Sequence, residues 1–186
     1  MDTSLVKYMI NFRYIKVFSS ATLLILLGLC VLMQSPNTYS AERIGNKTLL
    51  PLPRFVSLRT EPANMRKGPG TNFPVVWVYK RKYLPVEVIE EFDSWRQVID
   101  PGGSEGWIHQ SILSGKRTGL IKRSDVSLHK GSTISSSVLA KLTVNVIVLL
   151  ERCPKNTDFC FLKVGNLKGW VLREEIWGIY EGEHIN

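Results

Sequence analysis

The sequence holds few of the residues that carry catalytic or metal chemistry. Among its 186 residues there are three histidines and three cysteines. No histidine lies close enough in the sequence to Cys153 and Cys160 to complete a set of zinc ligands, so we expect no metal site. A cysteine hydrolase needs a thiol beside a histidine base, whereas these two cysteines look like a disulfide pair. The sequence therefore predicts a protein that is not an enzyme and that needs no cofactor.

The remaining histidines and the carboxylates form no obvious acid–base pair. We expect His109 and His129 beside strand ends on the surface, and His184 in a mobile C-terminal tail. The adjacent glutamates at 90–91 and at 174–175 would point to opposite faces of a strand. This arrangement gives no support to acid–base catalysis.

Acidic residues are fewer than basic ones, with 16 Asp and Glu against 24 Lys and Arg. Without residues 1–41 the chain keeps 21 basic and 15 acidic residues, a net charge of +6. A basic surface attracts nucleic acid, anionic lipid and anionic cell-wall polymer alike. The compartment therefore has to decide among these partners.

The N-terminal segment indicates that compartment. Residues 1–16 carry three basic residues, residues 17–33 form a weakly polar to apolar run, and small and polar residues follow at 35–41. This is the arrangement of a secretory signal peptide. We expect residues 1–41 to direct export, either as a cleaved signal peptide or as an inner-membrane anchor through residues 17–33. A third alternative is a lipoprotein signal, because residues 27–30 (LGLC) resemble a lipobox.

Export to the periplasm or the exterior reduces the classes of binding partner that the protein can meet. It disfavours nucleic acid, and we expect membrane contact only through the N-terminal segment. Cys153 and Cys160 fit the oxidising compartment as well, because they flank turn-forming residues between an apolar strand at 146–150 and residues 161–164. Cysteines on the two sides of a hairpin tip lie within reach of a disulfide. We expect this disulfide; two unpaired thiols are the alternative.

The chain beyond residue 55 has no convincing amphipathic helix. Short apolar and aromatic runs, such as residues 85–90 and 95–99, alternate with clusters of turn-forming residues. This pattern predicts many short strands and an all-β fold. Ahead of them, residues 42–54 hold two prolines and no periodic pattern, which favours an extended linker.

An internal repeat organises the part of the chain that follows. A shift of 63 residues aligns glycines and hydrophobic residues along two copies, which we place at 56–117 and 119–179. We expect about five extra residues in the first copy near 80–84. The aligned pairs are Lys67-Gly68 with Lys130-Gly131, Val75 with Val138, Gly106-Trp107 with Gly169-Trp170, Leu113 with Ile176, and Gly115 with Gly178.

The stretch from Lys67 to Thr71 has the composition of a phosphate-binding loop but not its order. A Walker loop places its lysine after the glycines and starts a helix, whereas Lys67 precedes them here and extended residues follow. Pro69 fixes φ for a turn, and Gly70 would permit a positive φ beside it. We interpret the stretch as a turn that leaves the first strand.

Residues 64–75 read Asn-Met-Arg-Lys-Gly-Pro-Gly-Thr-Asn-Phe-Pro-Val, and Gly106-Trp107-Ile108 follows near the end of the first copy. With these motifs the first copy resembles the bacterial SH3-like domain, often called SH3b, over essentially all of residues 56–117. That family opens with Asn-apolar-Arg and a Gly-Pro turn, and it closes with Gly-Trp and an apolar residue. The matching residues are Asn64, Met65, Arg66, Gly68, Pro69, Gly70, Pro74, Val75, Gly106, Trp107, Ile108, Ser111 and Leu113. In the second copy Gly169-Trp170-Val171 is intact, but Ser127-Leu128-His129 replaces the opening. The resemblance implies two tandem small SH3-like β-barrels, the second one diverged.

The resemblance also implies binding, because domains of this family are thought to bind cell-wall peptides or glycan. Aromatic faces stack on sugar rings, and cations meet carboxylates. In the first copy the candidate aromatic residues lie among Arg96 and the basic run at 80–82, which is either a ligand contact or a solvated loop. We expect Trp107 and Trp170 to fill the barrel cores. The candidate binding residues are Asn64, Arg66, Trp77, Tyr79, Tyr83 and Trp95.

Two functions remain open. The favoured one is a non-catalytic exported module that binds peptidoglycan or cell-wall peptide, and the alternative is a protein–protein adaptor that binds an envelope protein or a secreted host partner. A wall-binding module should gather its aromatic and basic residues in one groove. An adaptor should show an exposed apolar patch or an unpaired edge strand.

Overall fold

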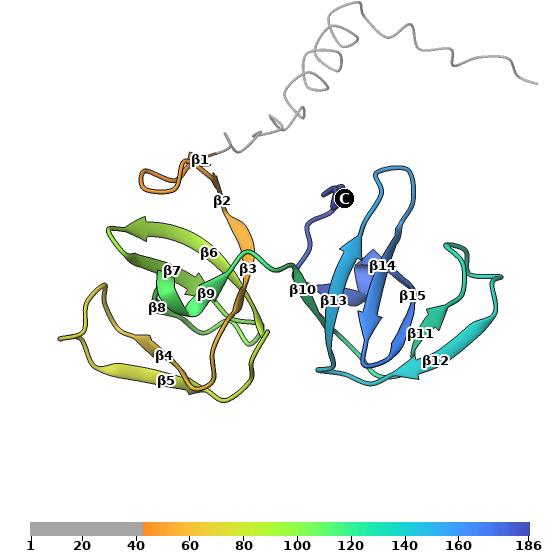
Figure 1. The fold of residues 1–186 in the computed structure, drawn as a ribbon, viewed down its shortest axis with the longest axis horizontal. Coiled ribbons are helices and arrows are strands. Elements are labelled where there is room, and N and C mark those ends of the chain that lie inside the picture. The colour runs from red at the N-terminus through yellow and green to blue at the C-terminus, as the bar shows by residue number, and fades with distance from the viewer. Residues whose placement is uncertain (1–42) are drawn as a thin grey trace, which may run out of the picture. The chain divides into compact units, whose positions relative to one another are not determined.

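The computed structural model describes residues 43–186, which form two seven-stranded antiparallel sheets and one short hairpin (Figure 1). Within these residues the helical elements are two 3-10 turns, η1 and η2. The prediction of an all-β fold is therefore confirmed. The expected signal peptide or anchor at 1–41 lies outside the described residues. In the described part of the chain no helix is long and apolar enough to span a membrane.

The first sheet has the strand order β5-β4-β8-β7-β6-β3-β9, which makes β5 and β9 its edges. Its hairpins join strands that follow each other in the chain, and η1 leads into the last strand. The elements are β3 Arg54–Leu58, β4 Ala63–Arg66, β5 Val75–Tyr79, β6 Pro85–Phe92, β7 Trp95–Ile99, β8 Glu105–His109, η1 Gln110–Ile112 and β9 Leu113–Ser114.

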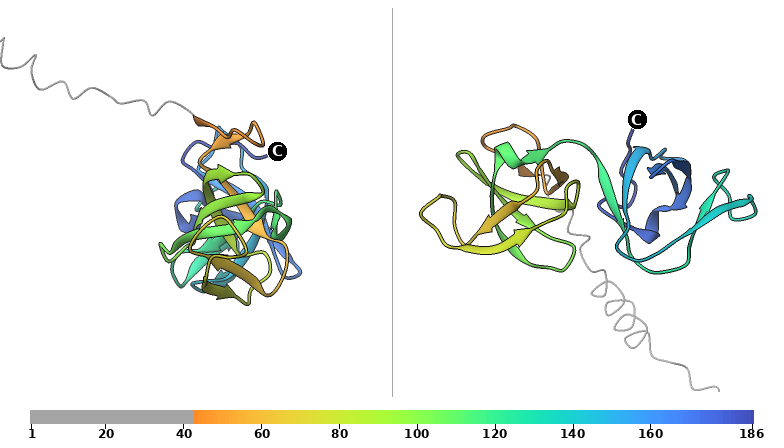
Figure 2. Two further views of the ribbon diagram at one scale, coloured as in Figure 1. Left: turned by 90° about the vertical axis from the view of Figure 1, so that its left-hand side faces the viewer. Right: turned by 60° about the horizontal axis from the view of Figure 1, so that its bottom comes forward.

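The second sheet repeats this order as β12-β11-β15-β14-β13-β10-β16. Figure 2 shows that the loop after β4 and the loop after β11 each project from their own sheet. The elements are β10 Thr118–Ile121, β11 Val126–His129, β12 Val138–Leu142, β13 Ile147–Arg152, β14 Phe159–Val164, β15 Leu167–Leu172, η2 Arg173–Glu175 and β16 Ile176–Trp177.

The 63-residue shift found in the sequence also relates the strands. It carries β4 onto β11, β5 onto β12 and β9 onto β16 at both ends of each strand. It carries the register as well, because Arg66 pairs with Trp107 and His129 pairs with Trp170. The expected five-residue difference near 80–84 is not found there. That loop has five residues and its counterpart at 143–146 has four, and the lengths differ more in the hairpins that follow.

Strand alternation builds one hydrophobic core on each sheet, and β10 contributes to both. Leu120 belongs to the core of the first sheet and Ile121 to the core of the second. Neighbouring residues in a strand point to opposite faces, so one short strand serves two cores. The fully buried side chains include Leu58, Met65, Val86, Val88, Val98 and Ile108 in the first core, and Leu128, Val148, Leu162 and Val171 in the second.

Side chains also connect the two sheets directly. The ring of Phe55 lies 5.0 Å from that of Trp177 and 4.6 Å from that of Tyr180, centroid to centroid. The Tyr180 hydroxyl donates a 2.6 Å hydrogen bond to the Glu87 carboxylate. These contacts indicate that the two sheets stabilise each other.

Residues 42–54 are not the extended linker that their composition indicates. They contain a hairpin of β1 Arg43–Ile44 and β2 Pro51–Leu52, and its loop covers the buried carboxylate of Glu91. The backbone amides of Lys47 and Thr48 each donate a 3.0 Å hydrogen bond to Glu91, and the Thr48 hydroxyl donates one of 2.6 Å. A Cβ at Gly45 would lie 2.6 Å from the same carboxylate, so only glycine fits there.

Two arginines complete the surroundings of Glu91, whose side chain is fully buried. Arg54 donates a 2.8 Å hydrogen bond to the carboxylate, and the Nε atom of Arg96 lies 3.5 Å from it. Burial alone would raise the pKa of Glu91. The hydrogen bonds from Thr48, Arg54 and the loop amides outweigh burial and lower this pKa to about 2.

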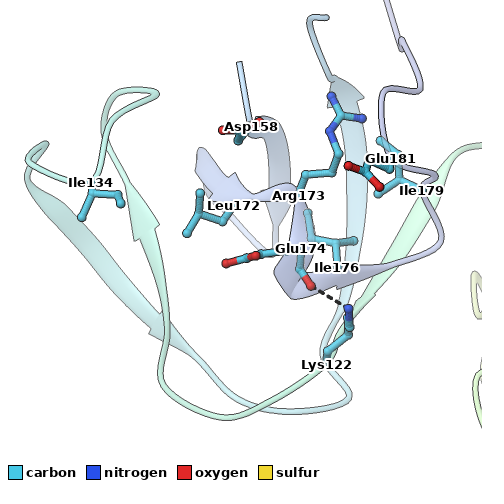
Figure 3. A pocket seen from close by; sticks show the side chains of 9 residues that line it. All are labelled: Lys122, Ile134, Asp158, Leu172, Arg173, Glu174, Ile176, Ile179 and Glu181. Atoms are coloured by element: carbon cyan, nitrogen blue, oxygen red, sulfur yellow. Dashed lines mark hydrogen bonds between the residues drawn. The ribbon is translucent and has the colours of Figure 1, made fainter. Parts of the chain in front are cut away.

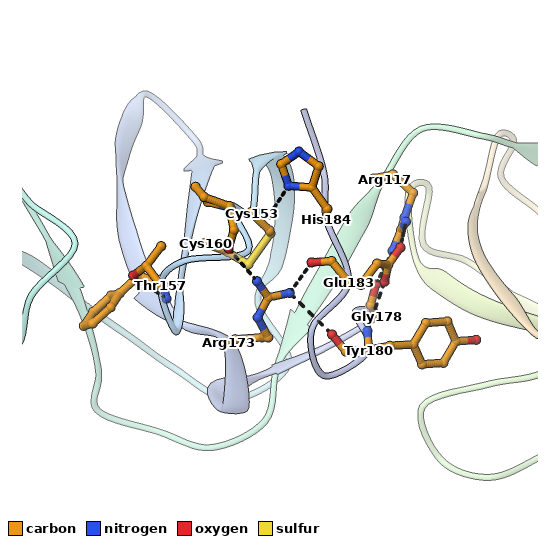
Figure 4. The surroundings of a disulfide bond; sticks show 11 residues. Arg117, Cys153, Thr157, Cys160, Arg173, Gly178, Tyr180, Glu183 and His184 are labelled. Atoms are coloured by element: carbon orange, nitrogen blue, oxygen red, sulfur yellow. Dashed lines mark hydrogen bonds and ion pairs between the residues drawn. A yellow bond between two sulfur atoms is a disulfide. The ribbon is translucent and has the colours of Figure 1, made fainter. Parts of the chain in front are cut away.

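The predicted disulfide between Cys153 and Cys160 is confirmed, and both cysteines are fully buried. The C-terminal tail lies beside this bond and is hydrogen-bonded to the chain, although the sequence favours a mobile tail (Figure 4). The Cys153 backbone exchanges hydrogen bonds of 2.8 and 3.1 Å with Ile185, and His184 Nδ1 lies 3.1 Å from the Cys153 carbonyl oxygen. Arg173 donates a 2.6 Å hydrogen bond to the carbonyl of Glu183.

We predict that Glu91→Gln lowers the free energy of unfolding by about 3 kcal/mol, because it leaves the buried Arg96 and the half-buried Arg54 without their counter-charge. Chemical denaturation of the full-length chain measures this change. The matched control is Glu90→Gln, since the Glu90 side chain is 44% exposed and pairs with the exposed Arg43. The control should cost less than about 1 kcal/mol. Equal losses in the two variants would contradict a structural role for the buried carboxylate.

The same substitution has a predicted pH dependence. The folded-state pKa of Glu91 lies below its ordinary value of 4.5, so its stabilisation is fully present above pH 4.5 and is lost as the pH falls through about 2. The difference in stability between the wild type and Glu91→Gln should therefore shrink as the pH drops across this window. Denaturation curves between pH 2 and 6 measure it, and a constant difference would contradict the assigned pKa.

We predict that the double substitution Cys153→Ala and Cys160→Ala loosens the C-terminal tail. The two cysteines are seven residues apart. Removing a cross-link that closes a loop of this size gives the unfolded chain more conformational entropy, which lowers the free energy of unfolding by about 2.5 kcal/mol. Hydrogen exchange at the Ile185 amide should become faster, while exchange in the first sheet stays slow. Unchanged exchange at Ile185 would show that the tail is held without the disulfide.

Candidate binding surface

The loop between β4 and β5 is a turn that its own backbone closes. The Lys67 amide donates a 3.0 Å hydrogen bond to the Pro74 carbonyl, and the Gly70 amide donates one of the same length to the Gly68 carbonyl. Amides that a phosphate would need are thus bonded within the chain. This geometry supports the interpretation of the stretch as a turn.

Arg66 holds the far side of this loop. Its guanidinium donates hydrogen bonds of 3.1 and 2.7 Å to the carbonyls of Thr71 and Phe73. The Phe73 ring packs over Gly68, where a Cβ would lie 2.5 Å from the ring and would displace it. Gly70 does not adopt the positive φ that we expected there. Arg66 therefore orders the loop, and its predicted role as a ligand contact is not what its hydrogen bonds indicate.

His129 occupies the position of Arg66 in the second sheet. It is buried, contrary to the expectation of a surface histidine, and its ring packs edge-on against Phe159 at 5.9 Å. Its Nδ1 atom lies 3.0 Å from the Ser136 carbonyl oxygen, so it holds the loop after β11 as Arg66 holds the loop after β4. Arg66 and His129 therefore both bind the backbone of the loop that follows their strand, although their side chains differ.

Tyr79, a predicted ligand contact, is a core residue. It is 6% exposed, and its hydroxyl donates a 3.0 Å hydrogen bond to the Asp100 carboxylate. Burial and the neighbouring Asp100 charge raise the pKa of Tyr79. Tyr79 is the last residue of β5 and the buried one, whereas the four residues before it are exposed. It is not available to a ligand.

Trp107 and Trp170, which we expected in the cores, lie half-buried outside them. The inward positions of β8 are taken by Gly106 and Ile108. A Cβ at Gly106 would lie 2.8 Å from the Arg66 carbonyl, so glycine is needed for β8 to approach β4. Since neighbours alternate, the tryptophan after each glycine must face outward.

Neighbouring side chains already contact the rings of Trp95 and Tyr83. Trp95 is half-buried, and its ring meets the His109 ring edge-on at 5.3 Å. Tyr83 is 37% exposed, and the ammonium groups of Lys82 and Lys116 lie over its ring at 5.2 and 4.6 Å. Cations therefore already occupy the Tyr83 ring.

Asn64 is exposed on β4, where it pairs with Val78. The side-chain hydrogen bonds to the turn come from its neighbour Arg66. The predicted aromatic residues also come from different places: Trp77 from the β5 edge, Tyr83 from the loop after β5, and Trp95 from β7. The first sheet thus does not gather its aromatic and basic residues in one groove.

Sequence reasoning missed the β5 edge as a surface. Among residues 43–186 this strand pairs only with β4, and its first four residues form an apolar run that is open to solvent. Both faces of the strand are apolar there, a pattern typical of strands that are covered on both sides. The unbroken run Val-Val-Trp-Val was the available signal. The exposed fractions are 40% for Val75, 47% for Val76, 54% for Trp77 and 46% for Val78.

The second sheet carries a shallow groove of about 550 Å³ between the loop after β11 and η2 (Figure 3). Ile134, at 73% exposed, projects from that loop at one side. Lys122 donates a 2.7 Å hydrogen bond to the Glu174 carbonyl at the other side. The charges in this groove have both signs, so it selects for no particular ligand charge.

Two observations concern the residues that could carry catalytic or metal chemistry. His109 Nδ1 lies 2.7 Å from the Ser111 hydroxyl and 3.3 Å from the Ser111 amide, an arrangement that caps η1. Within residues 43–186, no group of three or more His, Cys, Asp or Glu side chains is placed to hold a metal ion.

Comparison with known proteins identifies part of the chain. No curated protein matches the chain. Solved structures that resemble it include NlpC2 and NlpC1 from Trichomonas vaginalis, at 13% and 12% identity and a TM-score of 0.31 each. They align with 67% and 72% of this chain, which spans about half of their length, 48% in both cases. Residues 59–115, which lie in the first sheet, match the family model of the bacterial SH3 domain.

Proposed function

We propose that this protein is a non-catalytic binding module of the bacterial cell envelope and that its binding surface is the β4–β5 side of the first sheet. The observation that carries this proposal is the exposed apolar β5 edge with Trp77, which lies inside the match to the bacterial SH3 domain. Contiguous exposed apolar residues on a soluble protein typically mark an interaction site. Trp77 is the predicted aromatic ligand contact with the most exposed ring.

The charge around this surface fits an acidic ligand. The chain from Pro62 to Val86 carries no acidic residue and five basic ones, which are Arg66, Lys67, Lys80, Arg81 and Lys82. Cations attract carboxylates, and an indole ring stacks on sugar rings or on apolar groups. Peptidoglycan and its peptides offer these groups, so they are a candidate ligand of this surface, although its aromatic and basic residues do not form the single groove expected of a wall-binding module.

The proposal includes the organisation of the whole chain. Residues 1–41 act as the export signal or inner-membrane anchor, and the two sheets act as tandem SH3-like barrels in the periplasm or outside the cell. The common strand order and the shared 63-residue register support two related units. Five basic residues surround the apolar edge of the first unit, whereas Lys130 and Lys141 are the basic residues near that of the second, so we assign ligand binding to the first.

A protein–protein adaptor is the second candidate, and the β5 edge favours it specifically. Strand edges pair readily with other polypeptides, because their outward N–H and C=O groups lack partners. An adaptor was expected to show either an apolar patch or an unpaired edge, and β5 shows both.

Wall binding is tested by sedimentation of the full-length chain, purified in mild detergent, with isolated peptidoglycan sacculi. We predict that the protein pellets at low and at moderate salt and that Trp77→Ala weakens the apparent affinity by at least about tenfold, as is typical of a buried aromatic contact. The matched control is Ile134→Ala, which removes an exposed apolar residue from the second sheet and should leave pelleting unchanged.

Salt separates specific binding from simple charge attraction. Contacts between exposed charges are screened at moderate salt, whereas stacking and apolar contacts persist. Pelleting that disappears with salt, or that Trp77→Ala and Ile134→Ala reduce equally, would contradict the proposed wall-binding surface. An absence of pelleting would exclude the wall ligand and leave the adaptor function.

A further inference from the structure

We infer that β5 takes up an extended acidic segment of a partner protein, which adds to the first sheet as an eighth strand. This inference builds on the binding surface of the proposed function and gives the adaptor candidate a defined ligand. Three features of the strand carry it: its free backbone edge, its apolar faces and its basic surroundings.

The free edge supplies the backbone groups. β5 is the terminal strand of the sheet, and its described partner is β4 on one side. Alternate residues of an edge strand point their N–H and C=O groups away from the sheet, where a further strand can bond them. Five residues at about 3.4 Å each give an edge of roughly 17 Å, enough for a peptide of similar length.

The side chains favour a partner that covers both faces of the sheet edge. Trp77 lies on the same face as Tyr79, with their ring centroids 6.4 Å apart, and so extends the core face outward. Val76 and Val78 lie on the opposite face, because strand residues alternate. An added strand would bury apolar side chains against both sets.

The basic surroundings select the charge of that strand. Lys67 and Lys80 are exposed and stand at the two ends of β5: the Lys67 amide bonds Pro74, just before the strand, and Lys80 directly follows it. A segment with a carboxylate near each end and apolar residues between matches this spacing. The same charges oppose pairing of β5 with a second copy of itself, because that would bring two basic edges together.

The equivalent edge of the second sheet is a weaker site. β12 also exposes apolar residues, with Val138 at 49% and Leu139 at 45%. Its lysine Lys141 donates a 2.8 Å hydrogen bond to Ser127 of the neighbouring strand and is therefore already engaged. The inference is accordingly restricted to β5, and the second sheet supplies matched controls.

The test measures binding of a fluorescent peptide, Glu-Val-Thr-Val-Thr-Val-Glu, to the full-length chain by anisotropy. Two control peptides have the same length: one is methylated at the backbone nitrogens of its central residues, and one carries lysine in place of both glutamates. We expect each control peptide to bind at least about tenfold more weakly, because the first cannot pair with the edge and the second is repelled. No binding of the acidic peptide, or equal binding of either control, would overturn the inference.

Matched variants place the peptide on β5. Lys67→Glu should weaken binding of the acidic peptide by about fivefold or more, since it reverses one flanking charge. Lys130→Glu changes the equivalent lysine of the second sheet and should have no effect beyond that of net charge. Equal effects of the two variants would overturn the assignment to β5.

The peptide experiment and the sacculus experiment distinguish a failure of the added strand from a failure of the proposed function. Pelleting with sacculi that depends on Trp77, without binding of the acidic peptide, would keep the proposed function and overturn the added strand. Peptide binding without pelleting would support the added strand and identify the protein as an adaptor.

Discussion

The close approach of β8 to β4 at Gly106 is the contact on which the exposed surface depends. Met65 and the Arg66 carbonyl lie so near that no side chain larger than hydrogen fits at Gly106. This contact attaches the β4–β5 hairpin to the end of the sheet, so β5 becomes an edge, and it turns Trp107 outward. Gly169 makes the same approach to the His129 carbonyl in the second sheet. The need for glycine at this contact therefore makes β5 an edge strand and turns Trp107 outward. The same need recurs at Gly169 in the second sheet.

The two sheets share this strand arrangement, but different interactions occur at the corresponding hairpins, β6–β7 and β13–β14. Near the end of β6, the buried Glu91 carboxylate binds Arg54, Arg96 and the loop of the N-terminal hairpin. Just after β13, a disulfide at Cys153 holds the C-terminal tail. Each end of the described chain is thus fastened to the nearer sheet, and β10 joins the two cores between them. The binding surface lies away from both fastenings, which leaves β5 open.

Features that follow from residue spacing could be predicted from the sequence. Features that depend on which face of the sheet a residue occupies could not. The strands, the 63-residue repeat, the turn at 67–71 and the disulfide all leave local or periodic signals. Tyr79 and Trp107 were assigned to the wrong faces, because no signal in either motif shows where the sheet ends or which face is covered. Glu91 was missed because its hydrogen-bond partners Thr48 and Arg54 lie more than thirty residues away, in a segment whose two prolines resemble those of a linker.

The central claim is that β5 binds through an edge that is open in the free protein, and amide hydrogen exchange tests it most directly. In the free full-length chain, alternate amides of Val75–Tyr79 should exchange quickly while those of β8 stay protected. After addition of a bound acidic peptide, the fast β5 amides should become protected. Protection of all β5 amides in the free protein, or fast exchange that persists when the peptide is bound, would contradict the account.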